Sequence, residues 1–382
     1  MADFDSHNGM PRESLAGSLS SQESDVLTGL SETDALQADP HAACLLQAAR
    51  TRGIEACFVK ARRKADKPLR SWLNLKLTKT EFLYRMGVLL HYLPDGSLVH
   101  INGLASQITT RKSLTKSFLQ TVGVSSPSGF CWQRDEIALA EAWFGSWQQP
   151  VCLKPEQGKK GTLVFPYIDR LSHFRTVFDI IGQYYPEIIV EESFPGQVYR
   201  YFYVHPHAVA VKLSRPASVK GNGVSSLESL IAAKNQIRLE RQVPGHKLIK
   251  VDAHLYAYLG RQGKDLNYVP PAGERCYLQA VSNGATGADS IACAPHESYA
   301  QRIEKACQSI PGLRIAAIDT MLRRPHEAAN PTNYRVLEIN SSPGVLPYHY
   351  PWEGPPQDVS GAILDLLTQL DQQADHQSAA GC

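Results

Sequence analysis

Apolar residues along the chain follow two spacings, and each spacing predicts a different secondary structure. Where they recur every three or four positions we expect an amphipathic helix, and short apolar runs between turn-forming residues predict strands. The predicted helices are residues 41–53, 110–124, 170–185, 296–310 and 358–370. The predicted strands are residues 54–61, 87–93, 188–194, 199–216, 314–322 and 334–340. The first part of the chain mixes both types and predicts a small α/β lobe, whereas the second half is β-rich.

Three further segments have distinct local patterns. Residues 149–167 predict a strand, a loop containing glycine and a second strand. Ser225 and Glu228 fit a capping box, so we expect a helix to begin there. Residues 241–295 are rich in Gly, Pro and Asn and predict an extended loop or hairpin. Segments this irregular inside a compact domain are often functional.

The length and composition predict a globular enzyme with more than one lobe. At 382 residues the chain exceeds the usual size of a single domain, so we expect two or three packed lobes. Its residues are 43% hydrophobic and 20% charged, which allows a sizeable core. Residues 1–40 are polar and predict a disordered leader, and residues 371–382 predict a disordered tail.

Charge and cysteine content narrow the functional classes. The 39 Lys and Arg residues nearly balance the 37 Asp and Glu residues, so the formal net charge of +2 predicts no nucleic-acid partner and no acidic membrane partner. None of the eight cysteines forms a Cys-x-x-Cys pair, which favours reduced thiols in a cytoplasm. The N-terminus lacks the apolar core of a signal peptide, and no run of 18 apolar residues occurs. We therefore expect a cytoplasmic protein.

Oxygen-bearing side chains gather at the ends of two predicted strands. Because side chains alternate along a strand, Glu338 and Asn340 share one face while Leu337 and Ile339 point to the core. Asp319 ends a similar apolar run, so neighbouring strands would bring three oxygen ligands together. Hard oxygen ligands without His or Cys favour Mg²⁺, which commonly accompanies phosphates. The alternative is an ordinary polar outer face.

A lysine and two glycines form a second candidate group. Lys154 lies near the end of an apolar strand, directly before a loop that contains Gly158 and Gly161. A glycine loop lets backbone N–H groups approach phosphate oxygens, and a nearby ammonium neutralises them. Taken alone this pattern is equally typical of an ordinary loop. Lys112 and Lys116 likewise read as surface lysines by themselves.

Five motifs in order over residues 100–368 resemble the ATP-grasp carboxylate–amine ligases. "TRKSLTKSFLQTVGVSSPSG" resembles the lysine-bearing helix of these enzymes, and "VCLKPEQGKKG" resembles their lid strand and glycine loop. "IIVEESFPGQVYRYFYV" resembles the nucleotide hinge followed by "G-x-x-Y-R". "AVAVKLSRPASVKGNGVSSLESLI" is similar to the segment "A-x-x-R-x-P-A-x-V-x-G-D-G" before a helix. "AIDTML" and "LEINSSPG" resemble the two metal-binding strands. The likeness is greatest to the ATP-grasp domain of cyanophycin synthetase, and more distant to D-alanine–D-alanine ligase and glutathione synthetase.

The resemblance implies a role for each matched residue. The implied ligands of Mg²⁺, with Mn²⁺ as the alternative metal, are Asp319, Glu338 and Asn340. Contacts to the ATP phosphates are implied for Lys112 and Lys154, with Gly158 and Gly161 in the loop that closes over them. The implied adenine hinge is Glu191, Glu192, Ser193 and Phe194. Groups near the transferred phosphoryl group are Arg200 and Arg215. The implied substrate contacts are Asn283, Ser341, Ser342 and Gly344.

Three positions depart from the pattern of these ligases. Val198 replaces the acidic residue that grips the ribose after the hinge glycine, which would loosen ribose recognition. Arg111 replaces the usual Asp before the helix lysine, and "GNG" at residues 221–223 replaces "GDG". The last two lie outside the implied metal set, so we interpret them as family variation.

The resemblance also implies the fold and the reaction. The fold would be an α/β (α+β) ATP-grasp fold with an antiparallel C-terminal sheet. Its implied parts are an N-terminal α/β lobe at residues 41–110, a central lid lobe at 111–190 and a C-terminal metal and ATP lobe at 191–370. ATP would phosphorylate a carboxylate, and an amine would attack the acyl phosphate to give an amide, ADP and phosphate.

The implied substrates are amino acids or short peptides, and a dipeptide is a more natural product than a polymer because the chain ends shortly after the ATP-grasp segment. Two alternatives stay open: a ligase that adds amino acids to a peptide or protein, and a catalytically silent ATP-binding module. The basic cluster at residues 60–70 is either a solvated face or a surface that attracts a charged carboxylate. A homodimer is also left open.

Overall fold

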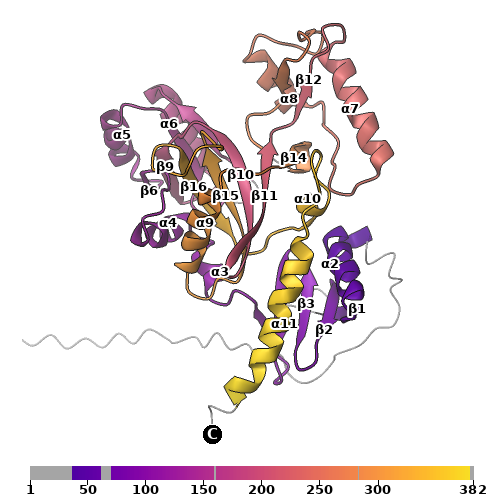
Figure 1. The fold of residues 1–382 in the computed structure, drawn as a ribbon. Helices are drawn as coiled ribbons and strands as arrows, with labels where there is room; N and C mark the ends of the chain where they lie inside the picture. Colours follow the sequence, from indigo (N-terminus) through magenta and orange to yellow (C-terminus); the bar gives the residue numbers. More distant parts are fainter. Residues whose placement is uncertain (1–36, 62–69, 159–160, 283, 379–382) are drawn as a thin grey trace, which may run out of the picture.

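The computed structural model describes residues 37–61, 70–158, 161–282 and 284–378. The predicted leader lies almost entirely outside the described residues, as do the last residues of the predicted tail. Within these ranges the chain forms three larger antiparallel sheets and one two-stranded sheet, each with helices packed on it (Figure 1). No helix in these ranges is long and apolar enough to cross a membrane. The seven cysteines in them are unpaired.

The N-terminal sheet is a meander in which each strand pairs with the next. Its strands are β1 (Glu55–Ala61), β2 (Arg70–Lys76), β3 (Glu81–Arg85), β4 (Val88–Tyr92) and β5 (Leu98–His100). Helix α2 (Pro40–Thr51) is capped by the Asp39 carboxylate and shares a core with the sheet, which includes Leu45, Leu73, Leu75 and Phe82. The predicted helix at 41–53 and the strands at 54–61 and 87–93 are confirmed, whereas the pattern did not predict β2 and β3.

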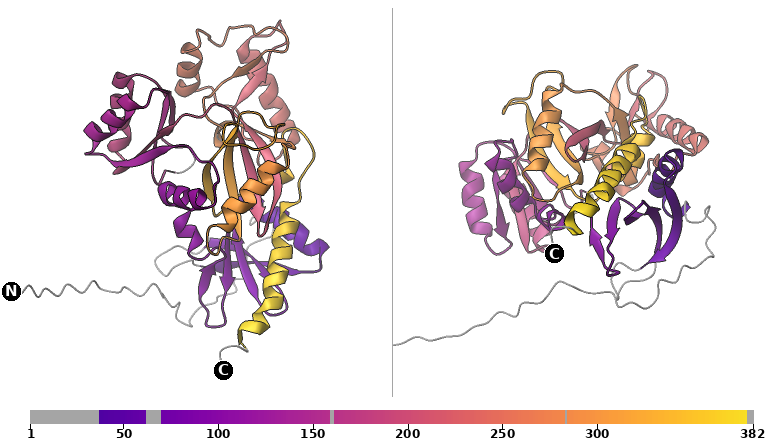
Figure 2. Two further views of the ribbon diagram at one scale, coloured as in Figure 1. Left: turned by 60° about the vertical axis from the view of Figure 1, so that its left-hand side comes forward. Right: turned by 60° about the horizontal axis from the view of Figure 1, so that its bottom comes forward.

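The central sheet has the strand order β6 (Gly129–Gln133), β9 (Glu187–Glu192), β7 (Val151–Pro155) and β8 (Phe165–Ile168). Helices α5 (Ile137–Ser146) and α6 (Leu171–Gly182) pack on it through Leu153, Phe174, Phe178, Ile181 and Ile188. Both helices lie on the side away from the C-terminal sheet (Figures 1 and 2). Helices α3 (Ala105–Ile108) and α4 (Lys112–Thr121) connect the N-terminal sheet to this one. The predicted strand, loop and strand at 149–167 and the helix at 170–185 are confirmed.

The C-terminal sheet has the order β14 (Asp289–Ala292), β11 (His207–Arg215), β10 (Gln197–Val204), β15 (Ile315–Leu322) and β16 (Tyr334–Asn340). One face packs against helix α9 (Ser298–Gln308) through a core that includes Tyr201, Tyr203, Ile303, Ile318 and Ile339. Along β10 the opposite face is apolar in one half and polar in the other. Phe202 and Val204 are buried in the same core as the N-terminal sheet, whereas Arg200, two residues earlier, makes polar contacts. The polar half of this face is the candidate site.

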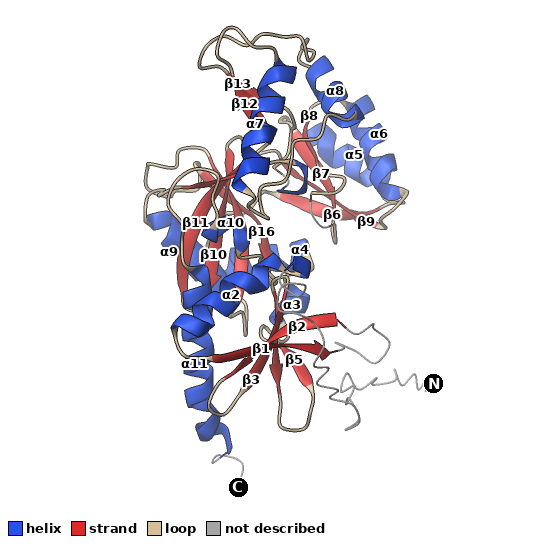
Figure 3. Ribbon diagram, turned by 90° about the vertical axis from the view of Figure 1, so that its right-hand side faces the viewer, coloured by secondary structure: helices blue, strands red, loops and turns tan. Residues whose placement is uncertain are grey.

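Helices at the C-terminus join the N-terminal sheet to the C-terminal sheet. Helix α10 (Leu346–His349) follows β16, and α11 (Val359–Ser378) runs beside the N-terminal sheet (Figures 1 and 3). The Asp371 carboxylate accepts hydrogen bonds from the backbone N–H of Lys79 and Thr80 and from the Thr80 hydroxyl, each at 2.8 Å. Because α11 continues to Ser378, the predicted disordered tail is wrong for residues 371–378.

Residues 216–288 form a separate small group of elements, which we call the outer lobe. It contains β12 (Ser218–Lys220), α7 (Leu227–Arg241), α8 (Ala253–Gly260), β13 (Arg275–Tyr277) and the short 3₁₀ helix η1 (Gly284–Thr286). Its core includes Val219, Leu227, Leu255, Leu259 and Leu278. The prediction of a loop or hairpin over 241–295 is therefore wrong, since leucines at helical spacing in α8 bury a face of their own. The helix cap was also misplaced by one residue, because the hydroxyl of Ser226 accepts the N–H of Ser229.

Candidate functional site

A cavity of about 390 Å³ lies between the central sheet, the C-terminal sheet and the outer lobe. The central sheet and the segment after β9 contribute Lys154, Glu191, Glu192, Ser193 and Phe194 to its wall, so five of the predicted nucleotide-binding residues meet there. The C-terminal sheet contributes Val198, Met321 and Leu337, and the outer lobe adds Tyr258 and Tyr277. The prediction that Leu337 points to the core is therefore wrong, because the register shift beside Glu338 puts Val336 in the core instead. The wall therefore combines an apolar slot with a buried ammonium and a buried carboxylate.

Strand register brings the predicted metal ligands together. In the β15–β16 pair Asp319 lies opposite Glu338, and a register shift follows directly after Asp319. The amide of Asn340 donates to Glu338 Oε1 at 3.0 Å. Arg200 lies opposite Asp319 in the β10–β15 pair, and its Nε donates to Asp319 Oδ1 at 2.5 Å while Nη2 donates to Oδ2. Arg200 thus binds the first carboxylate through both of its oxygens.

The two carboxylates have opposite pKa shifts. Burial by itself raises the pKa of Asp319, but the charge and hydrogen bonds of Arg200 outweigh it, so the pKa lies below its ordinary value. The pKa of Glu338 is raised by burial and then by the charge of Asp319, since its nearest Arg200 nitrogen is 4.0 Å away. Two adjacent carboxylates with one guanidinium between them leave negative charge that is not fully compensated.

These residues fit a hard divalent cation in the chemistry of their donors. Asp319, Glu338 and Asn340 offer only oxygen atoms to a metal, the ligand type that Mg²⁺ and Mn²⁺ prefer. The described residues contain no group of three or more His, Cys, Asp or Glu side chains that could hold a metal, so this set of two carboxylates and one amide would need further ligands. Phosphate oxygens and water usually complete such a site for Mg²⁺.

Two lysines share the carboxylate of Glu191. Lys154 Nζ lies 2.6 Å from Glu191 Oε1, and Lys116 Nζ contacts Oε2. The side chains of Lys154, Lys116 and Glu191 are only 8%, 16% and 3% exposed. The interpretation of Lys116 as a surface lysine is therefore wrong. The pKa of Glu191 is lowered overall, because the two ammonium groups outweigh the effect of burial. This triad carries one net positive charge toward the cavity.

The remaining hinge residues are also held by side-chain contacts. Both carboxylate oxygens of Glu192 accept hydrogen bonds from Arg335, at 2.9 and 3.0 Å. The Arg335 guanidinium lies 4.4 Å from the centre of the Phe194 ring, within cation–π distance. Ser193 Oγ accepts the backbone N–H of Tyr167 at 3.1 Å, which ties this segment to β8. The side chains of the hinge are thus used for anchoring, and the backbone N–H groups of Glu192 and Ser193 donate to the carbonyls of Ser128 and Pro150 at 2.7 and 3.0 Å.

Lys112 connects helix α4 to the glycine loop. Its Nζ donates to the carbonyls of Glu156 and Gly158, both at 3.0 Å. The Glu156 carboxylate accepts the Ser113 N–H and hydroxyl at 3.0 and 2.6 Å, which satisfies the start of the helix. Lys112 also lies in the field of Glu338, although burial lowers its pKa overall. At Gly161 the backbone has φ +70°, a conformation that glycine adopts without strain.

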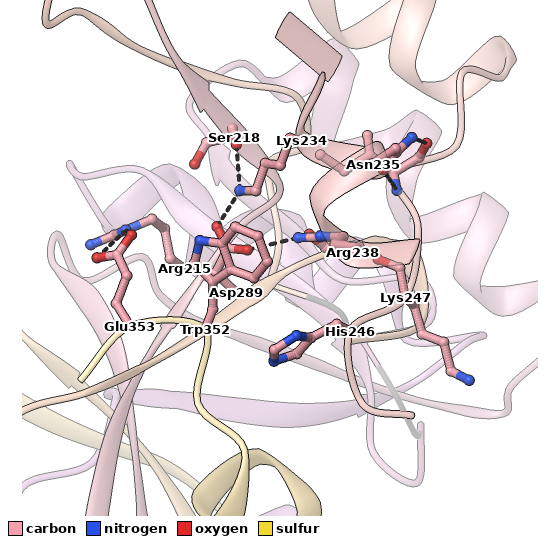
Figure 4. A network of polar contacts seen from close by, with 12 residues as sticks. Arg215, Ser218, Lys234, Asn235, Arg238, His246, Lys247, Asp289, Trp352 and Glu353 are labelled. Carbon is pink, nitrogen blue, oxygen red and sulfur yellow. Dashed lines mark hydrogen bonds and ion pairs between the residues drawn. The ribbon is translucent and has the colours of Figure 1, made fainter. Parts of the chain in front are cut away.

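The structure separates Arg215 from the carboxylate pair. Its Nη1 lies 3.1 Å from Glu353 Oε1, and Figure 4 shows this pair beside a second network around Asp289. The buried Asp289 carboxylate lies 2.6 Å from Lys234 and 2.7 Å from Arg238, both on α7. The Asp289 network holds the outer lobe to strand β14. Arg215 therefore belongs to the junction with the outer lobe, although it still lines the cavity.

Lys212 is a further cation beside Arg200, and the sequence reasoning did not consider it. It pairs with Arg200 in the β10–β11 register and is 6% exposed. Lys212 Nζ donates to Ser214 Oγ at 2.9 Å and lies 6.0 Å from the centre of the Tyr348 ring. Alternation along β11 could have indicated it, but only once its register with β10 was known.

The loop after β16 is held by residues from the N-terminal part of the chain. His41 Nδ1 accepts the N–H groups of Val345 and Leu346 at 3.0 and 3.3 Å, and a Cβ on Gly344 would lie 2.5 Å from the His41 ring. Ser342 Oγ lies 3.3 Å from His100 Nε2, and the Ser341 carbonyl accepts from Asn102 at 2.8 Å. Gly344 is therefore required for close packing. Asn283, the remaining predicted substrate contact, lies outside the described residues.

Comparison with known proteins places this geometry in a fold family. The structure resembles the crystal structure of a bifunctional glutathione synthetase from Pasteurella multocida with a TM-score of 0.61 and 23% sequence identity, over 87% of this chain and 44% of that one. The chain has an ATP-grasp fold. The fold class and the resemblance predicted from the sequence are thereby confirmed. No protein-family model matches the chain.

Curated relatives of the ATP-grasp chain are ligases. It is 29% identical over 322 residues to cyanophycin synthetase of Trichormus variabilis, which covers 81% of this chain and 34% of that protein. It is 28% identical over 273 residues to the glutathione biosynthesis bifunctional protein GshAB of Clostridium perfringens, which covers 69% of this chain and 34% of that protein. The matched region thus spans about a third of the length of these relatives.

Proposed function

We propose that the protein is an ATP-dependent carboxylate–amine ligase that forms an amide bond through an acyl phosphate and releases ADP and phosphate. The observation that carries this proposal is the juxtaposition of Asp319, Glu338 and Asn340 on adjacent strands of an ATP-grasp sheet that also borders the cavity containing Lys154 and the hinge. The similarity to cyanophycin synthetase and GshAB supports the same reaction class.

Each part of the site would then have a defined task. The backbone of Glu191–Phe194 would bind adenine, with Val198, Met321 and Leu337 packing around the base. Lys154 and Lys112 would contact phosphates, and the loop with Gly158 and Gly161 would exclude water from the reacting groups. The central sheet would form the lid, while the C-terminal sheet would carry the metal and phosphate end.

Asp319, Glu338 and Asn340 would hold Mg²⁺, or Mn²⁺ in its place. The metal would supply charge neutralisation for the phosphates. Arg200 would keep Asp319 ionised and oriented, because its guanidinium binds both oxygens of that carboxylate. In this assignment Arg200 is a positioning residue for the metal ligand.

We further propose amino acids or short peptides as substrates. The relatives named above act in cyanophycin synthesis and in glutathione biosynthesis, as their names state, and ligases of these kinds act on amino-acid or peptide substrates. A peptide or protein acceptor is the second candidate. The catalytically silent module is disfavoured because Lys154, Arg200 and the proposed metal ligands are all held in polar contacts within the protein.

The test combines two measurements on purified protein with Mg²⁺, ATP and pooled amino acids. Phosphate release together with a new mass equal to two amino acids minus water would establish a dipeptide ligase. Omitting amino acids one at a time would identify the substrates. Glu338→Gln should abolish both signals, and the exposed Asn267→Ala should keep them. ATP binding without any new mass, with amino acids or with peptides as acceptors, would contradict the ligase proposal.

A further inference from the structure

Lys212 is a buried cation without a carboxylate partner. It is 6% exposed, and no carboxylate among the described residues forms an ion pair with its ammonium within 4.0 Å. Its one hydrogen bond goes to Ser214 Oγ at 2.9 Å, so two of its three donors are left for another ligand. The Tyr348 ring is 6.0 Å away and gives only weak compensation.

Burial of such a group is unfavourable unless something compensates the charge. Removing an ammonium from water is strongly unfavourable when no counter-charge is present. Burial, and then the charge of Arg200, lower the pKa of Lys212 to about 7. A hydrophobic residue at this position would pack against Tyr348 without that cost. The lysine is therefore better explained by a ligand than by stability.

The neighbouring charges indicate what that ligand is. Arg200 has its guanidinium bound to both oxygens of Asp319, so the pair presents little net charge. Lys212 lies on the same face of the sheet, next to Arg200 in the β10–β11 register. Among the described residues it is consequently the cation on this face that has no carboxylate bound to it. The anion expected beside a divalent metal and a lysine is a phosphate.

The sequence around Lys212 is consistent with this position being functional. In the motif "A-x-x-R-x-P-A" the arginine stands two residues before the proline, and in this chain that position is Ser214. Arg215 is one residue further and binds Glu353 instead. Lys212 donates to Ser214, so its ammonium lies beside this motif position.

We propose that Lys212 is a catalytic residue whose ammonium binds the phosphoryl group that is transferred from ATP to the substrate carboxylate. This inference rests on the proposed ligase function. A carboxylate oxygen forms a bond to the γ-phosphorus while the bond to the ADP oxygen breaks, and that electron pair leaves with ADP. The amine nitrogen then forms the amide bond, loses its proton to water, and displaces phosphate with the electron pair of the carbon–oxygen bond. Lys212 keeps its proton and stabilises the phosphoryl oxygens in both steps.

The test compares two nucleotides in three variants. Lys212→Met, Lys212→Arg and the exposed control Lys305→Met on α9 are titrated with Mg²⁺·ATP and Mg²⁺·ADP by calorimetry without amino acids. Lys212→Met should weaken ATP binding by about tenfold or more while the Kd for ADP stays within about twofold, because a charge-assisted hydrogen bond to the third phosphate is lost. Lys212→Arg should recover part of the ATP preference, and Lys305→Met should match the wild type.

Stability and turnover provide the second readout. The Tm of Lys212→Met should equal or exceed that of the wild type, and its rate of phosphate release with amino acids should fall by about 100-fold or more. An equal loss of ADP and ATP affinity, an unchanged ATP affinity, or a lower Tm would each overturn the assignment in favour of a structural lysine. If the wild type binds ATP but forms no amide, the ligase proposal fails, whereas the ATP-to-ADP comparison still decides the role of Lys212. A wild type that binds neither nucleotide would overturn both.

Discussion

Asn102 links three segments of the chain through one side chain, and its removal should reveal how the N-terminal part supports the site. The amide is 1% exposed. Its Nδ2 donates to the carbonyls of Ile315 and Ser341, each at 2.8 Å, and its Oδ1 accepts the N–H groups of Arg314 and Ile315 at 2.8 and 2.9 Å. It therefore fixes the start of β15 relative to the residue that directly follows Asn340, a proposed metal ligand.

The expected cost of Asn102→Ala follows from these four bonds. Each hydrogen bond contributes about 1 kcal/mol net, and backbone groups left buried without a partner cost more. We expect a loss of about 4 kcal/mol, which is a large part of the roughly 5–15 kcal/mol that stabilises a typical protein. Asn102→Asp should be at least as damaging, because it keeps the two accepted bonds but turns an oxygen toward the carbonyls of Ile315 and Ser341.

Urea unfolding followed by tryptophan fluorescence, with and without Mg²⁺·ATP, measures the effect. The exposed Asn267→Ala serves as the matched control and should change stability by less than about 0.5 kcal/mol. Asn102→Ala should also weaken Mg²⁺·ATP binding, since the Ser341 carbonyl is no longer held. A loss of stability below about 1 kcal/mol would refute the view that all four bonds are made in solution.

Three further predictions concern other contacts. Gly344→Ala should lower the free energy of unfolding in urea by about 2 kcal/mol, since its Cβ would lie 2.5 Å from the His41 ring. Recovery of stability in the double variant with His41→Ala would support this cause, whereas additive losses would contradict it. Glu191→Gln should cost about 3 kcal/mol because it leaves two poorly exposed ammonium groups without a carboxylate, and unchanged thermal and urea stability would rule out that pairing. Burial alone raises the pKa of Asp371, but hydrogen bonds from Thr80 and Lys79 lower it below the ordinary 3.8. The contribution of Asp371 to the stability of the protein is therefore present above pH 3.8 and is lost as the pH falls through the pKa of the folded state. Acid titration of Asp371→Asn should therefore show a smaller loss of stability at low pH than the wild type, and identical pH dependences would contradict the assignment.

Periodicity predicted the elements of this fold wherever a single buried face dominates. Helices at 170–185 and 296–310 and the strands that carry Asp319 and Glu338 have an uninterrupted pattern of that kind, and the structure confirms them. Strand β2 was missed although its apolar and polar residues alternate from Leu73 to Lys76, so the sequence did contain the signal for it. In the outer lobe the start of α7 was predicted to within one residue, but α8 was missed although Leu255 and Leu259 stand at helical spacing, because the Gly, Pro and Asn residues around it favoured a loop.

Site residues were predictable from sequence only where local order determines their position. Strand alternation is a local property, so the shared face of Glu338 and Asn340 could be predicted. The pairing of Lys116 with Glu191 joins residues 75 positions apart, and the contact of His41 with Val345 spans 304 positions. Such contacts depend on how lobes pack, and no spacing rule encodes them.

The charged groups around the site differ in whether the protein itself provides a partner for them. Arg200 binds Asp319 and two lysines share Glu191, so both of these carboxylates have a cationic partner within the protein, whereas Glu338 accepts a hydrogen bond from the neutral Asn340 amide. Lys212 on the same face resembles Glu338, because its ammonium is buried and its one hydrogen bond goes to a neutral hydroxyl. Under the proposed function, the carboxylates are already oriented and need not move when a metal and phosphates bind. The ammonium of Lys212, by contrast, would gain a counter-charge when the phosphates bind. The binding energy of the third phosphate should therefore be concentrated at Lys212, and this is why the difference between ATP and ADP affinity is the measurement most sensitive to it.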